Sequence, residues 1–234
     1  MTSRKTPPAA ALAGMIDHTF LKAFGAEADI RRLCEEALEY RFAAVMVNPA
    51  EVERCAQLLR HSGIAVGTTI GFPLGQNTAA VKEYEMRDAV RRGARELDMV
   101  INIRALQAGD VETVRKEMDR LASVCREAQC VSKVILETCY LGDREKRAAC
   151  ALAQNAGIDF VKTSTGFGTG GATVADVRLM RAAVGPKMGV KASGGIRDLD
   201  AALDMIEAGA SRLGTSSGVA IVTEALSKRE KGSV

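Results

Sequence analysis

The sequence predicts a single parallel (β/α)8 barrel, and its hydrophobic pattern is the main reason. Short apolar runs rich in β-branched residues alternate with charged segments that have a helical hydrophobic period. The apolar runs lack the polar alternation of a sheet with one face in water, which indicates strands that are buried on both faces and pair in parallel. Eight such units in 234 residues correspond to about one unit per 30 residues, the spacing of a closed barrel.

The predicted elements follow one another regularly along the chain. Strands are expected at 14–21, 43–48, 65–72, 97–102, 133–138, 160–165, 189–193 and 212–215. Helices are expected between them at 30–40, 51–61, 79–92, 110–128, 144–155, 174–184 and 198–208. In the last helix, Leu199, Ala202, Leu203 and Ile206 have the spacing i, i+3, i+4, i+7 of one helix face. Glycines follow several of these segments, where a left-handed helix cap is expected: Gly63, Gly93, Gly157 and Gly209.

An open, doubly wound sheet is the alternative architecture. Such a sheet would usually carry a glycine-rich turn after its first strand, whereas here the glycines cluster after the last three strands. No linker or change in composition divides the chain. We therefore expect one barrel domain over residues 1–234, with a short N-terminal extension over about residues 1–13.

The composition argues against several classes of partner and site. Lys and Arg number 32 against 29 Asp and Glu, and aromatic residues make up 4% with no Trp, which argues against nucleic-acid binding. No apolar run approaches the roughly 18 residues of a membrane helix, and Pro7, Pro8 and Asp17 interrupt any signal peptide. Two histidines and six cysteines without a CxxC predict no metal site and no disulfide framework. A cytoplasmic protein with reduced thiols is expected.

Charged residues lie where an apolar strand should not tolerate them. Lys162 and Lys191 lie late in two consecutive predicted strands, and Asp98 interrupts another. Burial lowers the pKa of a lysine and makes the amine nucleophilic at neutral pH, and a second ammonium nearby lowers it further. Asp98 is the expected acid–base partner, exchanging protons near neutrality. The alternative is purely structural: each lysine reaches solvent at the barrel mouth or forms a buried salt bridge.

Three glycine- and serine-rich turns follow the last three predicted strands, where barrels commonly hold phosphate. They span 166–171, 193–197 and 214–218, and Arg197 is the only basic residue in them. Glycine lets backbone N–H groups approach an anion, and serine hydroxyls add further donors. The turns therefore predict a phosphate site built mainly from neutral donors. His18 and His61 are expected to be structural.

Together these segments resemble the deoxyribose-phosphate aldolase family, in order from about residue 14 to 222. The motifs are IDHTFLK (16–22), VNP (47–49), GFPLG (71–75), ELDMVIN (96–102), KVILET (133–138), VKTSTGF (161–167), VKASGGIR (190–197) and GTSSG (214–218). Some relatives have a Cys before Asn-Pro, a small residue at the position of Arg104, or a tyrosine-bearing tail. This chain has none of these, so the group that assists enamine protonation stays open.

The resemblance implies a class I aldolase, a lyase of deoxyribonucleotide catabolism. It would cleave 2-deoxy-D-ribose 5-phosphate reversibly into acetaldehyde and D-glyceraldehyde 3-phosphate. It implies that Lys162 forms the Schiff base, that Lys191 perturbs it and that Asp98 is the acid–base group. The substrate and its phosphate are expected to contact Asp17, Thr165, Gly166, Gly194, Gly195, Ser216 and Ser217. No cofactor is implied, the partner is a sugar phosphate, and a homodimer is plausible. Another Schiff-base aldolase, a transaldolase and a non-catalytic sugar-phosphate-binding barrel are the alternatives.

Overall fold

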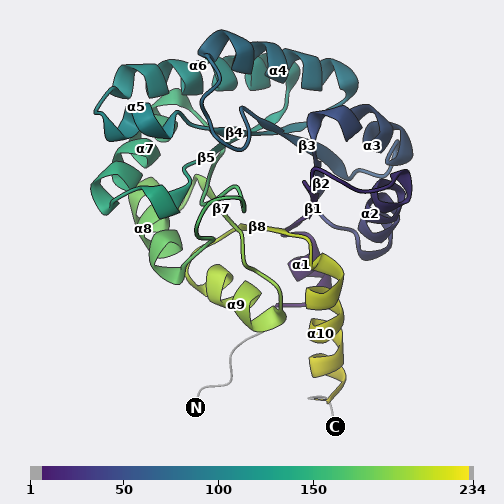
Figure 1. The fold of residues 1–234 in the computed structure, drawn as a ribbon. Coiled ribbons are helices and arrows are strands. Elements are labelled where there is room, and N and C mark those ends of the chain that lie inside the picture. The colour runs from purple at the N-terminus through teal and green to yellow at the C-terminus, as the bar shows by residue number, and fades with distance from the viewer. Residues whose placement is uncertain (1–6, 232–234) are drawn as a thin grey trace.

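The structure is a computed structural model that describes residues 7–231, and it contains the predicted closed barrel (Figure 1). All eight strands pair in parallel with their neighbours in chain order, and β8 closes the sheet against β1. The strands are β1 (Ile16–Phe20), β2 (Ala44–Val47), β3 (Ala65–Ile70), β4 (Glu96–Val100), β5 (Val131–Ile135), β6 (Phe160–Lys162), β7 (Gly189–Ser193) and β8 (Arg212–Thr215). The closed sheet confirms the predicted (β/α)8 barrel, and the alternative of an open, doubly wound sheet is wrong.

Helices surround the sheet and bury its outer face (Figure 1). They are α2 (Glu27–Tyr40), α3 (Val52–Leu58), α4 (Ala79–Arg92), α6 (Val111–Ala128), α7 (Asp143–Ala156), α8 (Val174–Val184), α9 (Leu199–Glu207) and α10 (Gly218–Lys231). Several begin at a side chain that caps the first turn, because the oxygens of Thr78, Asp110, Thr173 and Asp198 accept backbone N–H groups there. Gly93 and Gly157 end α4 and α7 in the expected left-handed conformation.

Three helices have no counterpart in the prediction. These are α1 (Ala9–Ala13), α5 (Ile103–Gln107) and α10, and two short 3-10 turns, η1 (Pro49–Glu51) and η2 (Thr138–Tyr140), are also additional. The predicted N-terminal extension contains α1, which packs against α10, while its residues 1–6 lie outside the described residues. In the described part of the chain, no helix combines the length and apolar character needed to cross a membrane.

The strand register decides which side chains meet inside the barrel. Neighbouring Cα positions pair Lys162 with Lys191 and Asp98 with Lys133, and register partners in a parallel sheet project to the same face. Two glycines on inner positions leave room for large neighbours. A Cβ on Gly189 would lie 2.2 Å from the Phe160 ring, and one on Gly214 would lie 3.0 Å from Lys191 Cε. The barrel interior is therefore shaped around long side chains.

Candidate active site

One carboxylate joins the two lysines singled out in the sequence. Asp98 Oδ2 lies 2.8 Å from Lys162 Nζ and 2.7 Å from Lys191 Nζ, and all three side chains are buried. Lys133 Nζ donates to the other oxygen, Asp98 Oδ1, at 3.0 Å. These groups come from four neighbouring strands, β4 to β7, so the closed sheet itself brings them together.

A second group of charges lies beside this cluster. Asp17 Oδ2 lies 2.5 Å from Lys191 Nζ, and Asp17 Oδ1 accepts a hydrogen bond from Arg212 at 2.5 Å. Glu96 accepts hydrogen bonds from Lys133 and Arg212. The interior thus holds four cations, Lys133, Lys162, Lys191 and Arg212, against three carboxylates. Burying so many charges is tolerable only because each has a partner of opposite sign.

These neighbours set the protonation states in the free protein. Burial lowers the pKa of Lys162 to about 8, with Lys191 adding to the decrease and Asp98 opposing it. Burial would raise the pKa of Asp98, but the ammonium groups of Lys133, Lys162 and Lys191 outweigh it and hold that pKa well below its ordinary value. In the free protein these three ammonium groups therefore favour the carboxylate form of Asp98, and its role as an acid–base group stays a prediction.

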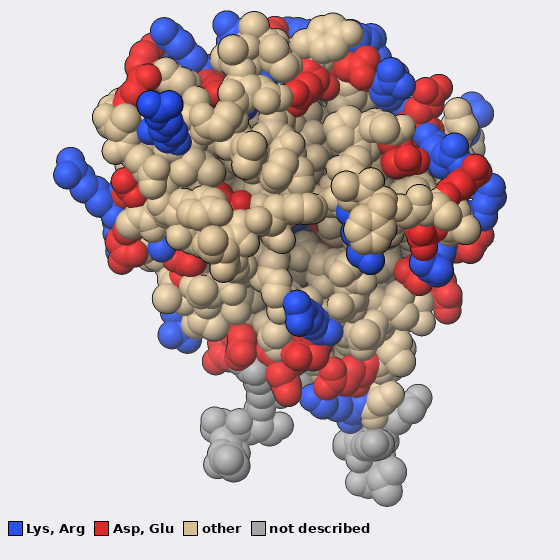
Figure 2. Space-filling model, in the orientation of Figure 1, with Lys and Arg blue, Asp and Glu red and all other residues tan. Residues whose placement is uncertain are grey.

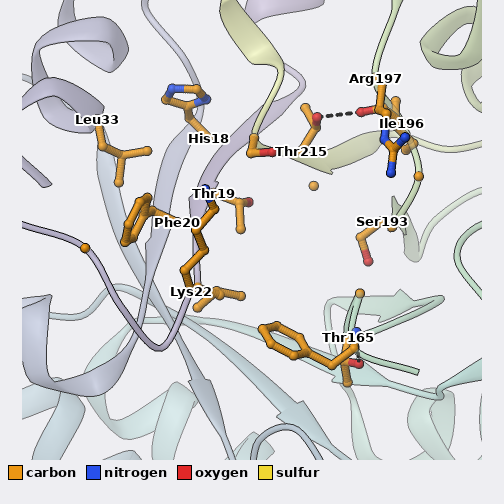
Figure 3. Close-up of a pocket in the computed structure, with 18 of the residues that line it drawn as sticks. His18, Thr19, Phe20, Lys22, Leu33, Thr165, Ser193, Ile196, Arg197 and Thr215 are labelled. Carbon is orange, nitrogen blue, oxygen red and sulfur yellow. Dashed lines mark hydrogen bonds between the residues drawn. The ribbon is translucent and has the colours of Figure 1, made fainter. Parts of the chain in front are cut away.

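A cavity of about 580 Å³ opens above the lysine cluster. Its walls come from the loops after β1, β6, β7 and β8 (Figure 3). The face drawn in Figure 2 is hollowed near its centre, and charged side chains crowd its periphery more than the edge of the hollow. Lys162 lines this cavity, whereas Lys191 is fully buried between Asp17 and Asp98. Only one of the two lysines thus has a surface open to a substrate.

The predicted phosphate-binding residues fall into three groups. Thr165, Gly166, Gly194, Gly195 and Ser216 all line the cavity. Ser217 instead lines an adjoining hollow between α2 and α10, which shares His18, Glu36 and Ser216 with the main cavity. Asp17 lines neither, because it is fully buried and ion-paired. Asp17 therefore presents no surface to the cavity in this structure, and its contact with the substrate stays a prediction.

Several hydroxyls at the cavity already have an acceptor for their proton. Thr165 Oγ1 donates to Glu137, Ser193 Oγ donates to the Ser164 carbonyl at 2.6 Å, and Thr215 Oγ1 donates to the Ile196 carbonyl at 2.6 Å. These bonds fix the turns after β6, β7 and β8 rather than offering a donor to a ligand. Thr165 Oγ1 also accepts the Phe167 N–H at 3.0 Å, so this hydroxyl is engaged both as donor and as acceptor within the protein.

Glycine is required where the turns after β6 and β7 touch. A Cβ on Gly171 would lie 2.3 Å from the Gly194 carbonyl oxygen, and Gly194 itself has a φ of +86°. The Ala172 N–H donates to the carbonyls of both Ser193 and Gly194 at 3.0 Å. The two turns therefore form one rigid wall of the cavity, with backbone groups close to its surface.

Some residues of the site were not identified from the sequence. Lys133, Glu96 and Arg212 complete the charge network, and Glu137 holds Thr165 through both its backbone N–H and its hydroxyl. The opposite wall comes from the segment after β1, which adds Phe20, Lys22 and Arg32. Lys22 stands inside the IDHTFLK motif, but nothing in the sequence pattern places it at the cavity.

His18 lines the cavity and is hydrogen-bonded to α2. His18 Nε2 lies 2.6 Å from Glu36 Oε2, and burial lowers the pKa of His18. All six cysteines are free. The described residues contain no group of three or more His, Cys, Asp or Glu side chains that could hold a metal ion. The chemistry available at this site is that of a buried amine beside a carboxylate.

Comparisons with known proteins agree on one family. The model of the DeoC/LacD family aldolases matches residues 12–224. A protein of Bacteroides thetaiotaomicron named deoxyribose-phosphate aldolase is 60% identical to this chain, over 94% of this chain and 92% of the relative. A protein of Thermococcus gammatolerans with the same name is 55% identical, over 90% of this chain and 95% of the relative. The solved deoxyribose phosphate aldolase of Aeropyrum pernix, described as tetrameric, is 34% identical, with a TM-score of 0.88 over 94% of this chain and 93% of that one. The chain belongs to the DeoC/LacD family of aldolases.

Proposed function

We propose that this aldolase cleaves 2-deoxy-D-ribose 5-phosphate reversibly into acetaldehyde and D-glyceraldehyde 3-phosphate through a Schiff base on Lys162. The observation that carries the proposal is a buried lysine at the base of the cavity, with a pKa lowered to about 8 and a carboxylate 2.8 Å away. Such an amine is neutral in about one molecule in ten at pH 7, enough to attack an aldehyde. The names of the relatives support this choice of substrate.

Lys162 is the better candidate for the imine than Lys191. The two lysines face the same carboxylate oxygen, but only Lys162 reaches the cavity. Lys191 is also ion-paired with Asp17, whose Oδ2 lies 2.5 Å from its Nζ. We therefore assign imine formation to Lys162, with Lys191 as the fixed positive charge beside it.

The cleavage steps follow from these positions. Lys162 Nζ adds to the C1 aldehyde, and loss of water gives an iminium ion. The C2–C3 bond then breaks: its electron pair becomes the enamine, the C3 hydroxyl becomes the carbonyl of glyceraldehyde 3-phosphate, and its proton passes to Asp98 directly or through water. Protonation of the enamine at C2 and hydrolysis release acetaldehyde. The iminium ion is the electron sink, so the scheme requires no metal or organic cofactor.

Acetaldehyde release from 2-deoxyribose 5-phosphate tests the substrate. Borohydride treatment in the presence of acetaldehyde tests the mechanism, and we expect a two-carbon adduct on Lys162, located by peptide mass spectrometry. The Lys162→Ala variant should show neither turnover nor trapping. An adduct on Lys191 would reverse the assignment, and trapping without release from this sugar phosphate would indicate another Schiff-base aldolase or a transaldolase. Absence of both would indicate a binding protein.

The remaining proposals concern metal independence, domain organisation, cellular location and oligomeric state. We propose that activity survives dialysis against EDTA, because Asp17, Glu96 and Asp98 are each paired with a lysine or arginine. We also propose one domain, a cytoplasmic location and a homodimer. The free cysteines are consistent with a reducing compartment, and the tetrameric relative supports self-association. Light scattering on the purified protein measures the oligomeric state.

A further inference from the structure

Two cations stand on opposite walls of the cavity without a carboxylate partner. Lys22 lies two residues after the end of β1, and Arg197 lies in the turn after β7 (Figure 3). Within residues 7–231, neither side chain forms a hydrogen bond or a close ion pair with a carboxylate, although the charge of Lys22 acts on the nearby Asp29 carboxyl, which is paired with Arg32. Other exposed basic residues are either ion-paired, as Arg92 is with Asp88, or lie outside the cavity, as Arg144 does. The cavity therefore contains positive charge that the protein itself does not neutralise.

The other charged side chains of the cavity wall compensate one another. Arg32 is paired with Asp29, and Glu36 accepts from His18 at 2.6 Å. Lys162 is paired with Asp98 at 2.8 Å. On the described cavity wall, the cations without a close carboxylate partner are thus Lys22 and Arg197, one on each side of the space above Lys162.

The chain around Lys22 holds it on the cavity wall. Asn48 Nδ2, from the VNP motif, donates to the Lys22 carbonyl at 3.2 Å. The Lys22 ammonium lies 5.9 Å from the ring centroid of Phe20 and 5.7 Å from that of Phe24. Aromatic faces attract an ammonium group without cancelling its charge. Lys22 is therefore positioned by its neighbours yet remains free to pair with an anion.

We propose that Lys22 binds the phosphate of the substrate, opposite the glycine turns and Arg197. This inference rests on the proposed function and names a specificity-determining residue for it. The turns after β6 and β7 offer mostly backbone N–H groups, because the hydroxyls of Thr165 and Ser193 are already donating within the protein. A phosphate dianion held by backbone donors on one side gains an ammonium partner on the other. Recognition of the substrate phosphate then depends on the positive charge of Lys22, in the segment after β1.

The test separates phosphate binding from catalysis and from folding. Lys22→Gln removes the charge and keeps a polar, somewhat shorter side chain, so KM for 2-deoxyribose 5-phosphate should rise about tenfold with kcat largely retained. For unphosphorylated 2-deoxyribose, kcat/KM should stay within about twofold of wild type. Lys22→Arg should restore much of the binding. Lys187→Gln is the matched control, because Lys187 is exposed and lies just before β7, at the opposite end of the barrel.

Each outcome decides one of the two proposals. If wild-type protein releases no acetaldehyde from the sugar phosphate, the proposed function fails, whatever Lys22 does. If wild-type protein is active and Lys22→Gln leaves KM unchanged, or impairs both substrates equally, the role of Lys22 is overturned. An unchanged melting temperature ensures that a loss in Lys22→Gln is not a loss of folded protein.

Discussion

At the scale of single residues, Lys162 and Lys191 share one oxygen of Asp98, so both Asp98 and Lys191 act on the pKa of Lys162. The carboxylate raises the pKa of Lys162, while burial and Lys191 lower it. The value of about 8 is the balance of these effects. Because only the neutral amine attacks an aldehyde, the rate of imine formation should fall about tenfold for each pH unit below this pKa.

Replacing Lys191 by Met should make Lys162 harder to deprotonate. The substitution removes a neighbouring positive charge and leaves Asp98 with one cation fewer, and both changes raise the pKa of Lys162. We expect the acidic limb of the pH profile for borohydride trapping to move up by about one pH unit. Trapping should slow at pH 7 and recover at pH 9. A profile that moves down, or a complete loss at every pH, contradicts this role for Lys191.

Replacing Asp98 by Asn should separate imine formation from bond cleavage. Loss of the carboxylate lowers the pKa of Lys162 further, so trapping with acetaldehyde should persist at neutral pH. Turnover of 2-deoxyribose 5-phosphate should fall about 10²- to 10⁴-fold, because the acceptor for the C3 hydroxyl proton is gone. Circular dichroism checks that the variant is folded. Equal losses of trapping and turnover would mean that Asp98 acts only by holding the lysines in place.

At the scale of elements, a buried ion pair fixes the end of the strand that carries Asp98. Lys82 on α4 lies 2.8 Å from Glu117 on α6, and both side chains are about 1% exposed. Lys82 Nζ also donates to the Val100 carbonyl at 2.9 Å, and Glu117 accepts the Asn102 N–H at 3.0 Å. Two hydrogen bonds thus attach α4 and α6 to the carboxyl end of β4, and the ion pair joins the two helices to each other.

Breaking this pair should cost far more stability than breaking a surface pair. Lys82→Met leaves Glu117 buried without its cation, and we expect the free energy of unfolding to fall by about 3–5 kcal/mol. Lys116→Met is the control on α6, because Lys116 and its partner Glu112 are both more than half exposed, and its effect should stay below about 0.5 kcal/mol. Urea denaturation at pH 7 measures both variants. Similar losses would show that the buried pair contributes no more than the surface pair.

The sequence predicted the strands better than the helices at the chain ends. The bounds of β7 and β8 were predicted correctly, since continuous apolar runs end there at Gly/Ser turns. Helix α10 was missed because its first residue is Gly218, a poor helix former that also belongs to the predicted phosphate turn. Tertiary packing against α1, which was missed as well, overrides that local signal.

The charged residues inside the barrel were likewise predicted only where a local sequence signal marked them. Lys162 and Lys191 were recognisable because a lysine late in an apolar run is unexpected. Lys133 and Arg212 were not, because each begins a predicted strand, where a charged residue is ordinary. Their burial follows from the closure of the sheet and from its register, which pairs Asp98 with Lys133 and Lys191 with Arg212. Such long-range pairings cannot be derived from local patterns.

At the scale of the whole molecule, the barrel is held around a charged interior rather than an entirely apolar one. Asp17 joins β1 to two other strands through Lys191 and Arg212, so it also closes the sheet between its first and last strands. Burial would raise the pKa of Asp17, but Lys191, Lys133 and Arg212 together lower it. Stability of the fold is therefore linked to the ionisation of the site.

This linkage predicts how stability depends on pH. A carboxyl group whose pKa is lower in the folded state contributes stability above its ordinary pKa of 3.8, and loses it as the pH falls through the folded value. The contribution of Asp17 should therefore be constant between about pH 5 and 7 and decline below about pH 4. Asp17→Asn lacks it at every pH and should be destabilised by about 3–5 kcal/mol at pH 7.

Urea denaturation at pH 7, 5 and 3.5 tests the sign of this effect. The difference in unfolding free energy between wild type and Asp17→Asn should be largest at pH 7 and 5 and smaller at pH 3.5, because there the unfolded wild type binds a proton at Asp17 more readily than the folded protein does. Asp200→Asn is the control, since Asp200 is 72% exposed and should change stability by less than about 0.5 kcal/mol throughout. A difference that grows on acidification would mean that Asp17 is protonated in the folded barrel, and that the positive charge around Lys191 is balanced by other groups.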